Sequence, residues 1–183
     1  MRHAAATRVL PIVALAFAFL LQAGCGYSLS GRGSFLPAYI KRIGVPNFTN
    51  ATSIFDVDRR VTERVRSELL GRGKYVVVPE TTGVDAVLSG EILSITVTPA
   101  AFNAQQQATR YALTLTAKVD FKDLKANKVL WSNPAMQYRE EFDVTTTTAA
   151  LDATAFFGQD VNALERIASE FARSVVSAIL EAF

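Results

Sequence analysis

The chain is nearly devoid of the side chains on which catalysis and metal binding most often depend. It has one cysteine, Cys25, and one histidine, His3, and both lie within the first 25 residues. The rest of the chain therefore lacks the cysteine and histidine residues needed for a Ser/His/Asp relay, a Cys/His relay, a zinc site or a structural disulfide. Acidic neighbours such as Glu140 and Glu141 point to opposite faces of a strand. We therefore expect no enzymatic activity, no cofactor and no metal site, and a hydrolase with two catalytic carboxylates is the least favoured alternative.

The chain also lacks an excess of charge of either sign. Lys and Arg together number 19, and Asp and Glu together number 17. Arg2 and Arg8 lie in an N-terminal segment without acidic residues, and without them 17 basic residues balance 17 acidic ones. Nucleic-acid binders neutralise phosphates with an excess of basic side chains. The balanced charge therefore argues against nucleic acid as a partner.

The first 24 residues have the layout of a secretory signal peptide. The two arginines precede an apolar run over residues 9–21, which the small residues Ala23 and Gly24 follow. This run is shorter than the about 20 apolar residues of a membrane-spanning helix, and Pro11 interrupts it. We therefore expect export with removal of residues 1–24, and a retained membrane anchor is the alternative.

The residues around Cys25 resemble a bacterial lipobox, in which small residues precede a cysteine that is acylated and becomes the N-terminus. Ala23 and Gly24 fit this pattern, whereas Gln22 stands where leucine is usual. The resemblance implies that Cys25 is the lipidation site, and several acyl chains attach a protein stably to a membrane. Gly26, in place of the aspartate of inner-membrane lipoproteins, implies transport to the outer membrane with the domain facing the periplasm. The alternative is a free thiol, which an oxidising compartment disfavours.

The rest of the sequence predicts a tether over residues 25–37, rich in glycine and serine, and a single α+β domain over residues 38–183. Alternation of apolar residues and the positions of proline predict five strands. Helical spacing of apolar residues predicts two amphipathic helices. We expect a two-layer sandwich with two helices on one face of a mainly antiparallel sheet of about four to five strands. The expected strands are 39–45, 74–80, 85–99, 109–123 and 129–144, and the expected helices are 53–73 and 160–183.

Several details of these elements are predicted from single residues. Ser53 or Asp56 can cap the first helix, and Gly71 can close it in a left-handed conformation. Asp160 can cap the second helix. The strand 85–99 is expected to be irregular at Gly90. In addition, Asn127 suits a turn with positive φ, Pro134 a bend in the last strand, and residues 100–108 and 145–159 form loops.

The clearest pattern lies in "TRYALTLTAKVDFKD", residues 109–123. Every second residue from Tyr111 to Phe121 is apolar, and the residues between them are mostly polar. This alternation is typical of an antiparallel strand with one face buried. The stretch "VLWSNPAMQYREEFDV" is its expected hairpin partner.

The order of several short motifs is similar to the LptE-like family of outer-membrane lipoproteins of lipopolysaccharide assembly. These motifs are Cys25-Gly26-Tyr27, "IGVPNFTNAT", "VTERVRSELL", "DAVLSGEI", "YALTLTAKVDFKD" and "KVLW". The resemblance implies a protein without enzymatic activity that partners a large outer-membrane β-barrel, aids its assembly and can contact lipopolysaccharide. The competing function is a periplasmic lipoprotein that activates a peptidoglycan synthase or supports another envelope secretion complex.

Three basic residues near the ends of the central hairpin are candidates for contact with lipopolysaccharide. Arg110, Lys125 and Lys128 lie beside loops or turns, where cations can meet lipid phosphates. The alternative is that the lysines in the turn protect a sheet edge from aggregation. The predicted loops 100–108 and 145–159 contain no Lys or Arg, so basic loop residues of relatives do not carry over to them.

Overall fold

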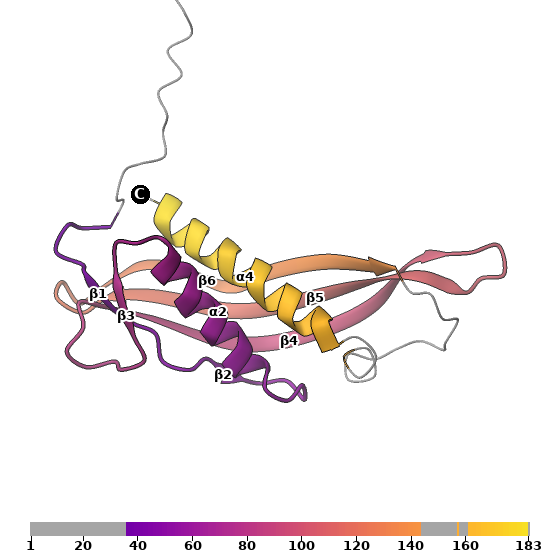
Figure 1. The fold of residues 1–183 in the computed structure, drawn as a ribbon, viewed down its shortest axis with the longest axis horizontal. Helices are drawn as coiled ribbons and strands as arrows, with labels where there is room; N and C mark the ends of the chain where they lie inside the picture. The colour runs from indigo at the N-terminus through magenta and orange to yellow at the C-terminus, as the bar shows by residue number, and fades with distance from the viewer. Residues whose placement is uncertain (1–35, 144–156, 158–160, 183) are drawn as a thin grey trace, which may run out of the picture. The chain divides into compact units, whose positions relative to one another are not determined.

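The computed structural model describes residues 36–143, 157 and 161–182, all within the unit Ser34–Phe183. Two long helices, α2 and α4, pack against one face of a six-stranded mixed sheet (Figure 1). The predicted α+β class with two helices on one sheet face is thereby confirmed. The helices are α2 (Val57–Gly71) and α4 (Val161–Glu181). The strands are β1 (Arg42–Gly44), β2 (Thr49–Asn50), β3 (Val76–Val78), β4 (Ala86–Phe102), β5 (Ala108–Asp123) and β6 (Lys128–Asp143).

The sheet differs from the prediction in two details, its strand number and its mixed character. The strand order is β3-β1-β4-β5-β6, and β2 also pairs with β4. The β4-β5-β6 part is antiparallel, whereas β1 is parallel to both β3 and β4, and β2 is parallel to β4. The parallel part arises because the chain leaves β1, passes through α2 and returns in the same direction as β3. β2 has only two residues, too few for an alternating pattern to reveal it.

The apolar side of α2 packs into the core as its spacing predicts. Thr62 is also buried there, and its hydroxyl joins the helix to the segment before β2. That hydroxyl donates a hydrogen bond to the backbone oxygen of Asp58 (2.6 Å) and accepts one from the backbone N–H of Phe48 (2.9 Å). The buried apolar residues of α2 are Val57, Val61, Val65 and Leu69.

The two ends of α2 differ from the prediction. Asp56 is the N-cap residue, but its φ is 66° and its side chain makes no capping hydrogen bond. Its carboxylate instead forms ion pairs with Arg59 (2.5 Å) and Arg60 (3.3 Å). Gly71 is the last helical residue, and Gly73 takes the left-handed conformation with φ 69°.

The long β4-β5-β6 meander supplies the other half of the core. On β5 the predicted face from Tyr111 to Phe121 is buried, and Asn127 in the following turn has a φ of 47°. The predicted bend at Pro134 coincides with a register shift, because Ala117 pairs with Met136 and Val119 with Asn133.

The predicted irregularity of β4 lies beside Gly90 rather than at it. The register shift falls between Ile92 and Ser94. Gly90 has a different role, since a Cβ atom at this position would lie 2.3 Å from a ring carbon of Phe48. The absence of a side chain therefore allows the Phe48 ring to pack against the strand.

The helix α4 buries a wide apolar stripe, as the sequence predicts. Its buried residues include Leu164, Ile167, Phe171, Val175 and Ile179. Several predictions fall outside the described residues and stay predictions. They concern Cys25, the cap residue Asp160, the final Phe183 and the loop 145–159 except Phe157.

Candidate functional site

The three candidate basic residues do not form one cluster. Arg110 lies near the start of β5, whereas Lys125 lies in the turn after β5 and Lys128 begins β6. Thirteen residues of extended strand separate Arg110 from Asp123 at the end of β5, a distance of roughly 40 Å. A single phosphate-binding site made of all three side chains is therefore not possible.

Two of these three cations are already paired within the domain. Arg110 forms ion pairs with Asp143 (2.8 Å) and Glu141 (3.6 Å), and the hydrogen bond to Asp143 is the main cause of its raised pKa. Lys125 forms an ion pair with Asp85 (2.6 Å). Lys128 has no ion pair with any residue that the structure describes, which leaves it as the freest of the three.

The partner of Lys125 belongs to a polar cluster that fixes one end of the sheet. Asp85, just before β4, accepts hydrogen bonds from the backbone N–H groups of Lys41 (2.9 Å) and Arg42 (2.8 Å). The hydrogen bond from Lys125, followed by these two backbone bonds, holds the pKa of Asp85 well below its usual range. The carboxylate thus connects the start of β1 with the β5–β6 turn.

A second carboxylate, Asp123, completes this cluster. Asp123 is buried, and it accepts hydrogen bonds from the hydroxyl of Tyr39 and from the backbone N–H groups of Lys125 (2.8 Å) and Ala126 (3.0 Å). Burial by itself raises the pKa of Asp123, but these hydrogen bonds and the charge of Lys125 outweigh it and leave the pKa lowered. Lys125 also lies 5.4 Å from the centre of the Tyr39 ring. These contacts indicate that Lys125 has a structural role.

The opposite end of the sheet is the β4–β5 hairpin, which extends beyond α4 (Figure 1). From Ile92 to Thr109 the chain has no charged residue. The strands continue farther than predicted, since β4 ends at Phe102 and β5 begins at Ala108, so that only residues 103–107 form the turn. Phe102 is 57% exposed at this tip.

The tip is shaped by Asn103. Its side-chain oxygen accepts hydrogen bonds from the backbone N–H groups of Gln105 (3.0 Å) and Gln107 (2.9 Å). Gln106 takes a positive φ of 60° between them. An asparagine whose side chain bonds to the backbone two residues farther along is a known turn former. Asn103 is therefore the sequence signal for a short turn, where a loop over residues 100–108 was predicted.

The face of the meander opposite the helices is polar. We call it the polar sheet face and define it by exposed residues that alternate with the buried ones along the three strands. They include hydroxyl, amide and basic side chains. The polar sheet face consists of Ser89, Thr96, Lys118, Lys122, Gln137 and Arg139.

Neither a metal site nor a membrane span is found in the part of the chain that the structure describes. There, no group of three or more His, Cys, Asp or Glu side chains comes close enough together to hold a metal ion. No helix among these residues is long and apolar enough to cross a membrane.

Solved structures of other proteins share this fold. The chain is similar to an uncharacterised lipoprotein B from Nitrosomonas europaea, with 15% identity, a TM-score of 0.51 and coverage of 86% of this chain and 94% of the other. It is also similar to a hypothetical protein from Chlamydia trachomatis, with 11% identity, a TM-score of 0.52 and coverage of 77% and 96%. For the rare lipoprotein B from Shewanella oneidensis the identity is 14%, the TM-score 0.44 and the coverage 78% and 92%. At such identities the first two likenesses show the fold alone.

The sequence itself identifies the family. No curated protein sequence matches the chain. The model of the LptE family, described as lipopolysaccharide-assembly, matches residues 40–179, which is more than half of the chain and includes all six strands, α2 and most of α4. The chain therefore belongs to the LptE family of lipopolysaccharide assembly.

Proposed function

We propose that this chain is a non-enzymatic outer-membrane lipoprotein, anchored through Cys25, that partners a large β-barrel in the assembly of lipopolysaccharide. The observation that carries the proposal is the family match over residues 40–179. The polar sheet face supports it, because the lumen of an outer-membrane barrel is polar and only its outer surface is apolar. A domain seated in such a lumen meets polar groups and water, which suit exposed hydroxyl, amide and charged side chains.

The β4–β5 hairpin is the part of the domain best suited to enter the partner. The central part of a protein interface is depleted of charged residues and enriched in aromatic ones. The hairpin has no charge from Ile92 to Thr109 and exposes Phe102 at its tip. Removal of an unpaired charge from water is costly, and insertion of this end requires no such removal. In this arrangement the other end of the sheet, where the chain enters from the tether, stays at the periplasmic side.

Contact with lipopolysaccharide is assigned to Lys128 alone among the three candidates. Lys128 is exposed and has no ion pair among the described residues, whereas Arg110 and Lys125 are paired with carboxylates. A free lysine can bind a lipid phosphate as a point charge without first breaking an internal ion pair.

Depletion of the protein in its native host tests the proposal. We expect less folded barrel in the outer membrane and less lipopolysaccharide at the cell surface, both restored by the wild-type chain. Normal amounts of both after depletion would overturn the proposal. Loss of peptidoglycan synthesis with intact barrel folding would instead favour the synthase-activating alternative.

A further inference from the structure

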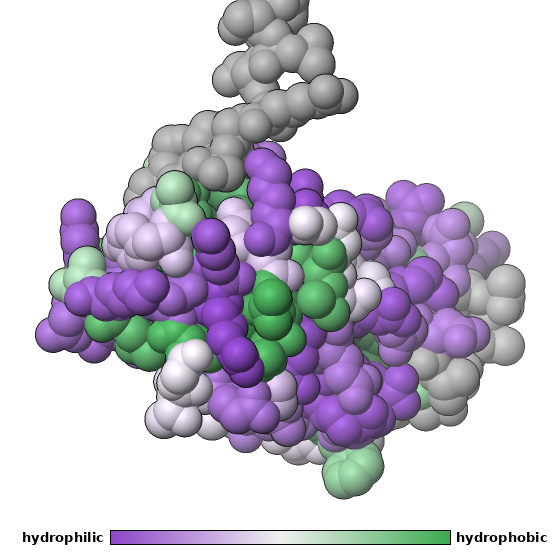
Figure 2. Space-filling model, turned by 60° about the vertical axis from the view of Figure 1, so that its left-hand side comes forward, coloured by the Kyte–Doolittle hydropathy of each residue, from purple (hydrophilic) through white to green (hydrophobic). Residues whose placement is uncertain are grey.

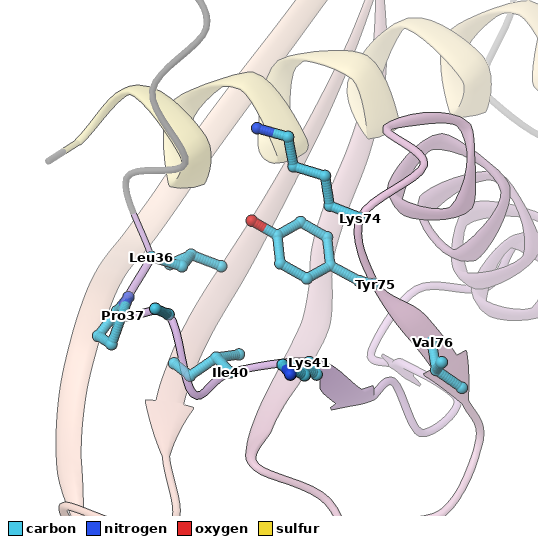
Figure 3. Close-up of a pocket in the computed structure, with 8 residues that line it drawn as sticks. Leu36, Pro37, Ile40, Lys41, Lys74, Tyr75 and Val76 are labelled. Atoms are coloured by element: carbon cyan, nitrogen blue, oxygen red, sulfur yellow. The ribbon is translucent and has the colours of Figure 1, made fainter.

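The structure contains a cavity at the end of the sheet where the chain enters from the tether. Its volume is about 320 Å³, and it lies between the segment that precedes β1 and the start of β3 (Figure 3). Leu36, Ile40 and the ring of Tyr75 line it, and the neighbouring Val76 is 57% exposed. Its lining is therefore largely apolar, although it opens to the surface.

Two lysines add positive charge to this apolar cavity. Lys41 and Lys74 both line it and both are exposed. Neither has an ion pair with any residue in the described ranges, and the nearby carboxylate of Asp85 is paired with Lys125. Figure 2 shows this end of the domain, where hydrophobic side chains lie between hydrophilic ones. An apolar cavity beside two unpaired cations complements a molecule that combines acyl chains with an anionic phosphate group.

The position of the cavity along the chain points to a membrane as the source of that molecule. Eleven residues separate Cys25 from Leu36. A fully extended segment of this length reaches at most about 40 Å, and a flexible segment rich in glycine and serine averages about 18 Å. If Cys25 carries the lipid anchor, the cavity is held within this distance of the membrane surface.

We propose that this end of the domain docks on the phospholipid surface next to the anchor. Lys41 and Lys74 bind phosphates of anionic phospholipid headgroups, and Val76 and Tyr75 contact the boundary between headgroups and acyl chains. The inference rests on the proposed anchoring through Cys25 and adds a second, protein-mediated contact with the same membrane. Such a contact fixes the orientation of the domain, because attachment at a single point does not define an orientation.

Vesicle sedimentation with the chain from residue 25 onward tests this proposal. Cys25→Ser removes the acylation site, so that only the protein surface can bind. We expect this chain to sediment with vesicles of phosphatidylglycerol and phosphatidylcholine and to stay in solution with phosphatidylcholine alone. Lys41→Gln with Lys74→Gln should weaken binding about 25-fold, since each lysine near an anionic surface contributes about a factor of five. Val76→Ser should weaken it without a change of charge.

The matched control is Lys118→Gln with Lys122→Gln, which removes the same charge from the polar sheet face. This pair should leave vesicle binding unchanged. Equal losses from the two pairs would show that net charge alone is responsible and would overturn the proposal. Binding to lipopolysaccharide but not to phosphatidylglycerol vesicles would also overturn it and assign the cavity to lipopolysaccharide. Thermal unfolding of each variant verifies the fold.

The docking proposal and the proposed function fail separately. The Lys41→Gln and Lys74→Gln pair should still co-purify with the barrel when Cys25 is intact, because the hairpin is unchanged. Barrel capture without vesicle binding would refute the docking surface alone. Vesicle binding by the wild-type surface without barrel capture would refute the barrel partnership alone.

Discussion

Gly90 is a residue at which a single added methyl group should disturb the core. Its missing Cβ leaves the space that the ring of Phe48 fills, and Phe48 is buried. Forcing extra volume into a packed site of this kind destabilises a protein by about 1–3 kcal/mol. We therefore expect Gly90→Ala to lower the free energy of unfolding by this amount in urea denaturation.

Gly71 supplies the control for this substitution. A Cβ atom there would meet no other atom within 4 Å, and the residue ends α2. Because alanine is favoured over glycine in a helix by up to about 1 kcal/mol, Gly71→Ala should be neutral or stabilising. Equal loss of stability in the two variants would contradict the packing account of Gly90.

Asp85 should make stability depend on pH in the acid range. Its carboxylate binds Lys125 and two backbone N–H groups, so its folded pKa lies below the unfolded value of about 3.9. As the pH falls, the unfolded chain takes up the proton first. The stability that Asp85 supplies is therefore complete above about pH 5 and is lost as the pH falls through the folded pKa.

Asp85→Asn tests this dependence. At pH 7 we expect the variant to lose about 1–3 kcal/mol of unfolding free energy, because a charged acceptor of three hydrogen bonds is removed. The difference from the wild type should narrow as the pH falls toward 2, as measured by urea denaturation at each pH. Glu80→Gln, at an exposed carboxylate without an ion pair in the described ranges, should match the wild type at pH 7. If the difference in unfolding free energy between the wild type and Asp85→Asn stayed constant with pH, the role of the charge would be refuted.

Lys128 and Arg110 should differ in their effect on lipopolysaccharide binding. Lys128→Gln should weaken the binding of purified lipopolysaccharide about fivefold, since it removes an unpaired cation. Arg110→Gln should change it little, because Arg110 is held by Asp143 and Glu141. Equilibrium binding of labelled lipopolysaccharide measures both, and unchanged binding in Lys128→Gln would remove this residue as a contact.

The residue-scale features differ in how far the sequence reveals them. Asn127 was predictable, since asparagine tolerates positive φ in a turn. The ion pair of Asp85 was not predictable, because its partner Lys125 lies 40 positions away and no local pattern connects the two residues. Similarly, the pairing of Arg110 with Asp143 depends on the register of β5 and β6, which only the folded sheet defines.

At the scale of elements, a substitution at the tip of the β4–β5 hairpin should affect binding to the barrel without affecting the stability of the domain. Phe102→Glu places a charge at the exposed tip, so the unfolding free energy should change by less than about 0.5 kcal/mol. The same charge in a partner interface is unpaired and desolvated. We therefore expect at least a tenfold loss of co-purified barrel, measured by quantitative blotting.

Phe55→Glu is the matched control for this substitution. Phe55 is 91% exposed and lies just before α2, away from the hairpin. This substitution introduces the same charge at another exposed aromatic residue, and barrel capture should stay at the wild-type level. If both variants lost the barrel equally, the hairpin would not be the specific contact.

The elements that the sequence predicts well are those with a repeating pattern. β5 alternates along its length because one face is buried, and α4 repeats its apolar residues every three to four positions. β1 and β3 lie within the predicted strands 39–45 and 74–80 but are only three residues long, and β2, with two residues, is too short for a pattern to predict it. Their parallel pairing follows from the path of the chain through α2, which is a property of the packed domain.

At the scale of the whole domain, the two ends of the sheet differ in chemistry. The end next to the tether has the Asp85 cluster and the two lysines of the cavity, whereas the β4–β5 hairpin has no charged residue from Ile92 to Thr109. We infer that the first end stays at the membrane surface and the second enters the barrel. The family resemblance implies a barrel partner, but the sequence alone did not indicate which end of the sheet would meet such a partner, because the predicted strands made the hairpin too short.

Site-specific photo-crosslinking in the native host tests the central claim most directly. A photoreactive amino acid replaces Phe102 at the hairpin tip or, as the control, Phe55. The account predicts an adduct with an outer-membrane β-barrel from position 102 and none from position 55. An adduct of position 102 with a peptidoglycan synthase, or no barrel adduct from a stably folded and correctly localised protein, would contradict it.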